Sequence, residues 1–169
     1  MRRKTRKQLL QVFWFLVKFN LLAIPLYLLL YLNFSYKPLQ NLVAFLSYKL
    51  LLALGTKASL DGSSLKVVNN FTIFFVEIDM DCTGWKSLYA LFSLTMATPF
   101  IKLKKKLFFL LVALPSIFFF NIVRIALTAY IYLVESSLFE FIHDFLWKFG
   151  LIFAILASWI LWLKYEKRI

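Results

Sequence analysis

Long apolar runs, each bordered by lysine and arginine, constrain this chain more than any other feature. Four of them approach or exceed the roughly 20 residues that a transmembrane helix requires: Leu10–Leu32, Trp85–Ile101, Leu107–Val134 and Phe145–Leu163. Hydrophobic residues make up 62% of the chain, which exceeds what a soluble domain needs to build one core. We therefore predict an integral membrane protein with a single domain, residues 1–169, that is mostly α-helical and contains about four transmembrane helices in a bundle.

Three basic clusters set the expected orientation of these helices. They occupy residues 2–7, 102–106 and 164–168, and each borders an apolar run, as the cytoplasmic flanks of membrane helices do. This pattern accounts for the net charge of +12 and argues against nucleic-acid binding, which favours a continuous basic patch or stripe. We expect a multi-pass protein of the cell membrane whose N- and C-termini are both cytoplasmic.

A fifth apolar stretch, Leu39–Leu54, is shorter and carries Gln40, Asn41 and Lys49. The first two basic clusters are both cytoplasmic only if an even number of spans separates them, and that requires this stretch not to cross. We therefore predict an interfacial helix on the outer side of the membrane. A fifth span remains the alternative, because the charge rule admits exceptions.

The outer segment that follows has the composition of a small β-structure. The run Leu60-Asp-Gly-Ser-Ser64 has turn chemistry, and the β-branched and aromatic run from Val67 to Ile78 is typical of one or two strands. We predict a small extracytoplasmic β-hairpin that leads directly into Cys82.

Cys82 is the single cysteine of the chain and lies where this outer segment meets an expected span. A lone thiol cannot form an intramolecular disulfide or a multi-cysteine metal site, so it is either packed and inert or reactive. Its neighbours from Glu77 to Ser87 include short, polar and charged residues, which favours a nucleophile at a membrane surface. A packed thiol is the structural alternative.

Two other polar residues are expected at the same depth. Arg124 lies three positions after Asn121, on the same helix face, and an arginine in a span is costly unless it faces a bundle interior or an aqueous site. A crossing of about 20 residues from the lysines at 102–106 reaches the outer boundary near Arg124. His143, the only histidine, directly precedes the last span, as Cys82 precedes the second.

Each of these residues also has a structural interpretation. Arg124 could pair with Asp79, Asp81 or Glu135, because intramembrane charges pair. Asn121 could form an interhelical hydrogen bond, and His143 could be an interfacial residue. Their shared depth and side of the membrane favour the catalytic interpretation of Cys82, Arg124 and His143.

Other chemistries have less support. One cysteine and one histidine do not complete a structural zinc site, so we predict neither a metal nor a cofactor. No span carries the paired aspartates of an aspartic intramembrane protease, and redox chemistry at the thiol would have no resolving cysteine.

Two motifs resemble those of the exosortase/archaeosortase family, and the chain looks like a compact member of it. Asp81-Cys-Thr-Gly-Trp-Lys-Ser87 is similar to that family's Cys-Ser/Thr-Gly-x-x-Ser motif, and Asn121-Ile-Val-Arg-Ile125 is similar to its Asn-x-x-Arg-Ile segment. His143 falls where the family has a third polar residue. The resemblance covers roughly residues 40–150.

The resemblance implies a membrane cysteine protease or transpeptidase with its active site on the extracytoplasmic side. Its substrates would be exported proteins whose C-terminal sorting signal combines a short motif, a transmembrane helix and a basic tail. The new C-terminus would pass to a lipid or another acceptor. Cys82 would be the nucleophile, Arg124 would stabilise the thiolate or the oxyanion, and His143 would be the general acid and base.

Three neighbours of these residues are expected to bind substrate: Thr83, Lys86 and Asn121. Thr83, with the backbone N–H groups that begin the next helix, could contribute to an oxyanion site. The competing hypothesis is a non-enzymatic membrane scaffold or assembly factor for cell-surface proteins, in which Cys82 is structural.

Overall fold

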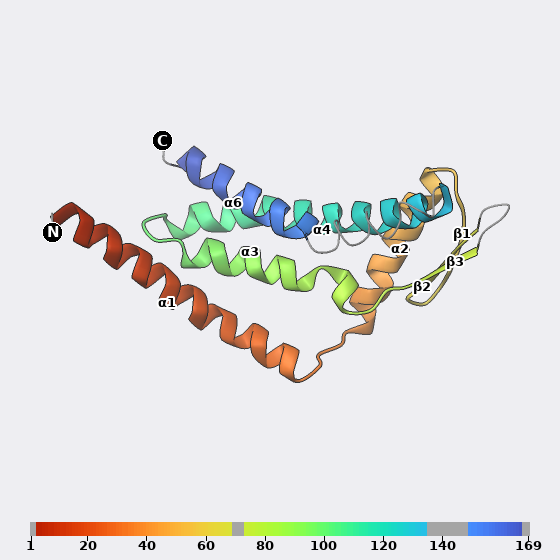
Figure 1. Cartoon of the computed structure of the whole chain (residues 1–169), viewed down its shortest axis with the longest axis horizontal. Helices are drawn as coiled ribbons and strands as arrows, with labels where there is room; N and C mark the ends of the chain where they lie inside the picture. The colour runs from red at the N-terminus through yellow and green to blue at the C-terminus, as the bar shows by residue number, and fades with distance from the viewer. Residues whose placement is uncertain (1–2, 69–72, 135–148, 167–169) are drawn as a thin grey trace.

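The computed structural model describes residues 3–68, 73–134 and 149–166. Four helices run side by side along the molecule, as Figure 1 shows: α1 (Arg3–Tyr31), α3 (Trp85–Ala97), α4 (Leu103–Val134) and α6 (Leu151–Glu166). α3 is central, because it contacts α1, α4 and α6. The start of α1, the connection from α3 to α4, and the end of α6 all lie at one end of the bundle (Figure 1). The described residues of the three basic clusters therefore lie at that end.

A transverse helix and a small β-sheet lie at the opposite end of the bundle. Helix α2 (Lys37–Ala53) lies steeply across the direction of the other helices there (Figure 1). Beyond it are three antiparallel strands in the order β1-β2-β3: β1 (Lys57–Asp61), β2 (Ser64–Val68) and β3 (Ile73–Glu77). α2 covers most of the predicted stretch Leu39–Leu54, and its position at the membrane interface stays a prediction.

The predicted β-hairpin is present, but it is part of a larger sheet. The turn between β1 and β2 needs Gly62, whose φ of 57° is readily adopted only by glycine. β1, which the sequence did not predict, pairs with the whole of β2. Its five residues alternate between exposed and half-buried, and so short an alternation does not distinguish a strand from a loop.

Two of the four predicted spans coincide with candidate membrane helices, judged by length and composition. Within the described residues, Arg6–Tyr31 and Leu103–Leu133 are the helical segments long and apolar enough to cross a membrane. α3 has 13 residues and α6 has 16, whereas a crossing requires roughly 20. α3 ends at Ala97, earlier than the predicted end at Ile101, and the chain turns before α4 begins.

Helix α3 stops just before Pro99, and a buried lysine satisfies the carbonyls at its end. Lys106 is only 9% exposed, and its ammonium group donates hydrogen bonds of 2.8 Å and 2.5 Å to the carbonyl oxygens of Met96 and Thr98. Those carbonyls have lost their helical partners, and a cation near a helix C-terminus is stabilising. One member of the second basic cluster therefore closes a helix instead of facing the membrane surface.

The core beneath the candidate site joins the sheet to two helices. It consists of six buried residues from α2, β2, α4 and the segment after β3: Val43, Ala44, Leu65, Ile78, Ile122 and Ile125. α4 continues ten residues past Arg124, and its last turns pack on the sheet, where Tyr132 stacks on Phe74 with ring centroids 3.9 Å apart. The last turns of α4 thus hold the sheet.

Candidate functional site

Cys82 lies in a short turn between the sheet and the bundle. After β3 ends at Glu77, the buried side chains of Ile78 and Met80 anchor the chain, and a 3₁₀ turn covers Asp81–Thr83. Gly84 then adopts a φ of 75°, which lets the chain reverse into α3 at Trp85. The Cys-Thr-Gly sequence thus places the thiol at the entrance to α3.

Hydrogen bonds on both sides hold the Cys82 backbone. Its N–H donates to the Asp79 carboxylate at 2.9 Å, and its carbonyl accepts a 2.9 Å hydrogen bond from the side-chain amide of Asn121 on α4. The thiol lies 3.9 Å from the carbonyl oxygen of Glu77, to which it donates a weak hydrogen bond. The nucleophile candidate therefore has a defined position before any substrate binds.

The contact between this turn and α4 is close. Asn121 is 1% exposed. A Cβ atom added at Gly84 would lie only 3.0 Å from the Asn121 side-chain carbon Cγ. The glycine of the motif thus serves two purposes, a positive φ and the approach of Asn121 to the Cys82 carbonyl.

Arg124 lies one helical turn after Asn121 on α4 and is 5% exposed. Burial raises the pKa of Cys82 to about 12, and the hydrogen bond and negative charge of Asp79 act in the same direction. The positive charge of Arg124 opposes them by stabilising the thiolate. The thiol is therefore neutral at rest. The Asp79 carboxylate raises its pKa, and the Arg124 guanidinium lowers it.

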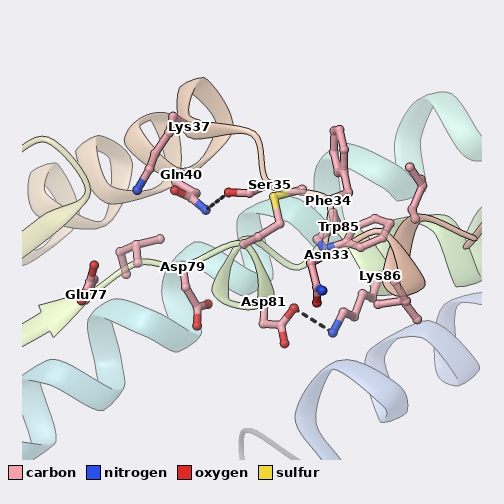
Figure 2. Close-up of a pocket in the computed structure, with 14 residues that line it drawn as sticks. Asn33, Phe34, Ser35, Lys37, Gln40, Glu77, Asp79, Asp81, Trp85 and Lys86 are labelled. Atoms are coloured by element: carbon pink, nitrogen blue, oxygen red, sulfur yellow. Dashed lines mark hydrogen bonds and ion pairs between the residues drawn. The ribbon is translucent and has the colours of Figure 1, made fainter. Parts of the chain in front are cut away.

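A polar pocket of about 410 Å³ borders this turn. Figure 2 shows it between the end of α1, the start of α2 and the segment from Glu77 to Lys86. Three carboxylates and two amines line it: Glu77, Asp79, Asp81, Lys37 and Lys86. The Lys86 amine pairs with Asp81 at 2.7 Å, and Asp79 connects the pocket to the Cys82 backbone. The pocket can hold a polar group beside this turn, although Cys82 itself does not line it.

The structure brings together most of the residues selected from the sequence. Cys82, Asn121 and Arg124 converge, and Lys86 lies nearby on the pocket wall. Thr83 is fully buried, and its hydroxyl donates a 2.7 Å hydrogen bond to the Met80 carbonyl. In this structure Thr83 stabilises the turn rather than facing a ligand. His143 lies outside the described residues.

Asp79 is the site residue whose role the sequence analysis missed. It was considered only as a partner for Arg124, yet its carboxylate is bonded to Cys82. The available signal was its spacing, because an aspartate commonly accepts hydrogen bonds from the backbone of residues that closely follow it in a turn. Among the described residues, no group of three or more His, Cys, Asp or Glu side chains is placed to hold a metal ion.

The chain also matches a known protein family. The family described as transmembrane exosortase matches residues 5–163, from the first helix to the last. Comparison with curated proteins and comparison with solved structures each found no match. Proteins of the matching family are known as membrane cysteine transpeptidases and are associated with protein sorting. Because the match extends over nearly the whole chain, including both motifs, this membrane protein belongs to the transmembrane exosortase family.

Proposed function

We propose that the protein is a membrane cysteine transpeptidase with Cys82 as its nucleophile. The observation that carries this proposal is the joint placement of Cys82, Asn121 and Arg124. The Cys82 carbonyl is fixed by Asn121, and the buried guanidinium one turn further along α4 stabilises the thiolate. Stabilisation of a thiolate by a neighbouring cation is the requirement for a reactive cysteine.

In the proposed reaction, the Cys82 sulfur attacks the scissile carbonyl of an exported precursor. Arg124 stabilises the negative charge on the tetrahedral oxygen. The C–N bond then breaks, and the leaving amine takes a proton and departs with the transmembrane helix and basic tail of the precursor. The resulting thioester is attacked by an acceptor nucleophile, which forms the new bond and releases the thiol.

Activation of the thiol requires a base, because its pKa is about 12 in this structure. The Asp79 carboxylate accepts a hydrogen bond from the Cys82 backbone N–H and acts on the pKa of the thiol, so we propose it as one candidate for the base. His143 retains the role of general acid and base that the family resemblance implies. A substrate backbone N–H that donates a hydrogen bond to the sulfur would also favour the thiolate.

The arrangement of the helices supports an outward-facing site in a single domain of residues 1–169. We propose that α3 and α6, with the segments flanking them, cross the membrane beside α1 and α4, and that the basic end of the bundle is cytoplasmic. The Cys82 turn then lies at the outer surface, where the cleavage site of a membrane-anchored precursor emerges. The polar pocket beside Asp79 and Lys86 is where we place the acceptor, whether lipid or another nucleophile.

The test is processing of a precursor that ends in a sorting motif, a transmembrane helix and a basic tail. Cys82→Ala and Cys82→Ser should both abolish cleavage, and Arg124→Gln should reduce it strongly. Ser59→Ala, at an exposed position on β1, is the matched control and should cleave normally. Cleavage retained by a folded Cys82→Ala variant would refute the enzymatic function and leave the scaffold hypothesis.

A further inference from the structure

The pattern of hydrogen bonds between β3 and β2 determines which backbone groups of β3 face away from the sheet. The Ile78 N–H donates to the Ser63 carbonyl at 2.9 Å, so residues 78, 76 and 74 exchange hydrogen bonds with β2. In an antiparallel ladder the alternate residues point their N–H and C=O groups to the other side. Those residues are Ile73, Phe75 and Glu77.

This outward row is open in the described structure. β3 is the terminal strand of the sheet, and no described residue forms a backbone ladder on its outer side. The side chains of Ile73 and Phe75 are 55% and 68% exposed. An unpaired strand edge of this kind is a template for an extended peptide, which would gain backbone hydrogen bonds by adding to it.

The thiol lies on this same edge. Glu77 is the last outward-facing residue of β3, and its carbonyl oxygen is the group to which the Cys82 sulfur donates at 3.9 Å. A peptide that followed the edge of β3 would therefore reach the sulfur directly after passing Glu77. The open edge of β3 and the Cys82 sulfur therefore form one continuous path for a bound peptide.

The direction of the chain fixes the direction of such a peptide. β3 runs from the far end of the molecule toward Cys82, after which α3 enters the bundle (Figure 1). A precursor whose transmembrane helix follows its cleavage site also runs from the exterior into the membrane. The two chains consequently run in the same direction.

We propose that the segment of the precursor preceding the cleavage site binds as an extra strand, parallel to β3, on its open edge. This inference rests on the proposed function and specifies how the substrate is held. The strand would position the scissile carbonyl at Cys82, with the precursor's transmembrane helix descending beside the bundle. Backbone pairing would supply affinity, and side chains on alternate faces would supply specificity.

The first experiment removes one outward N–H. Phe75→Pro leaves the β2–β3 ladder intact, because the Phe75 N–H points away from β2, and proline is tolerated on edge strands. Ala58→Pro is the matched control, since the same alternation points the Ala58 N–H away from β2 on the opposite edge strand. Phe75→Pro should slow precursor cleavage by about tenfold, the effect of losing one or two hydrogen bonds, and Ala58→Pro should leave it nearly unchanged. Equal rates in a folded Phe75→Pro variant and the wild type would overturn the proposal.

The second experiment determines direction, using a Cys82→Ala background in which the precursor is not consumed. Ile73→Cys or Phe75→Cys is oxidised with precursors that carry one cysteine at successive positions before the cleavage site. For a parallel strand, Ile73→Cys should capture a position about two residues further from the cleavage site than Phe75→Cys does. The reverse order, or no capture by either variant, would overturn the proposal. Cleavage that survives Cys82→Ala would instead refute the enzymatic function, so the two failures are distinguishable.

Discussion

Replacement of Gly84 by alanine tests whether Asn121 holds the active-site turn through close contact. Two costs are expected. A φ of 75° costs a non-glycine residue about 1–2 kcal/mol. The new Cβ would also lie 3.0 Å from Asn121 Cγ, so the amide must move and its hydrogen bond to Cys82 is weakened or lost. Overpacking of a buried contact adds about 1–3 kcal/mol, and loss of the hydrogen bond adds about 1 kcal/mol.

Gly55 is the matched control for this substitution. Its φ is 78°, but a Cβ there meets nothing within 4 Å. Gly55→Ala should therefore cost only the backbone term of about 1–2 kcal/mol, whereas Gly84→Ala should cost about 3–6 kcal/mol. The measurement is the free energy of unfolding in mixed detergent micelles, titrated with a denaturing detergent.

A double substitution separates the backbone strain at Gly84 from the collision. Once Asn121→Ala has removed the amide, adding Gly84→Ala should cost only about 1–2 kcal/mol, because the collision partner is gone. Equal costs for Gly84→Ala and Gly55→Ala, or strict additivity of Gly84→Ala with Asn121→Ala, would refute the reasoning.

Three further predictions concern buried charge and the thiol. Asp79→Asn should lower the pKa of Cys82, because the hydrogen bond and charge of Asp79 raise it. Iodoacetamide should therefore alkylate this single cysteine faster across about pH 7 to 10. An unchanged alkylation rate would contradict the effect assigned to Asp79. The raised pKa also means that the stability contributed by the neutral thiol is fully present below pH 9.0 and is lost as the pH rises toward about 12. Detergent unfolding at increasing pH measures this, and Cys82→Ala should abolish that part of the dependence. Lys106→Met should cost about 1.5–3 kcal/mol of unfolding free energy through its lost hydrogen bonds, whereas Lys104→Met, at an exposed position in the same cluster, should cost little.

Much of the architecture could be predicted from one-dimensional patterns. Apolar runs and basic clusters indicate a membrane bundle, since burial in lipid and retention of cations at the cytoplasmic face act on the chain segment by segment. The interfacial position expected for Leu39–Leu54 follows from the same charge counting and stays a prediction. The spacing of Asn121 and Arg124 placed both on one helix face, where the structure has them.

Other features depend on contacts between distant segments. The short strand β1 forms because it pairs with β2 and packs beside α2, and α3 ends where Lys106, from the following helix, satisfies its last carbonyls. The pairing of β1 and the contact made by Lys106 are not visible in a local window of sequence, although Pro99 marks where α3 stops. The prediction for His143 stays a prediction, because that residue lies outside the described part of the chain.

The sequence by itself determined that the chain belongs in a membrane, and it singled out Cys82, Asn121 and Arg124. It did so because lipid burial and helical periodicity are properties of consecutive residues. Only the tertiary structure decided what surrounds the thiol. The Asp79 carboxylate, the Asn121 amide and the open edge of β3 meet at Cys82 because the sheet packs against α2 and α4. The hydrogen-bond partners and the pKa of Cys82 follow from that packing, which no single segment of the sequence encodes.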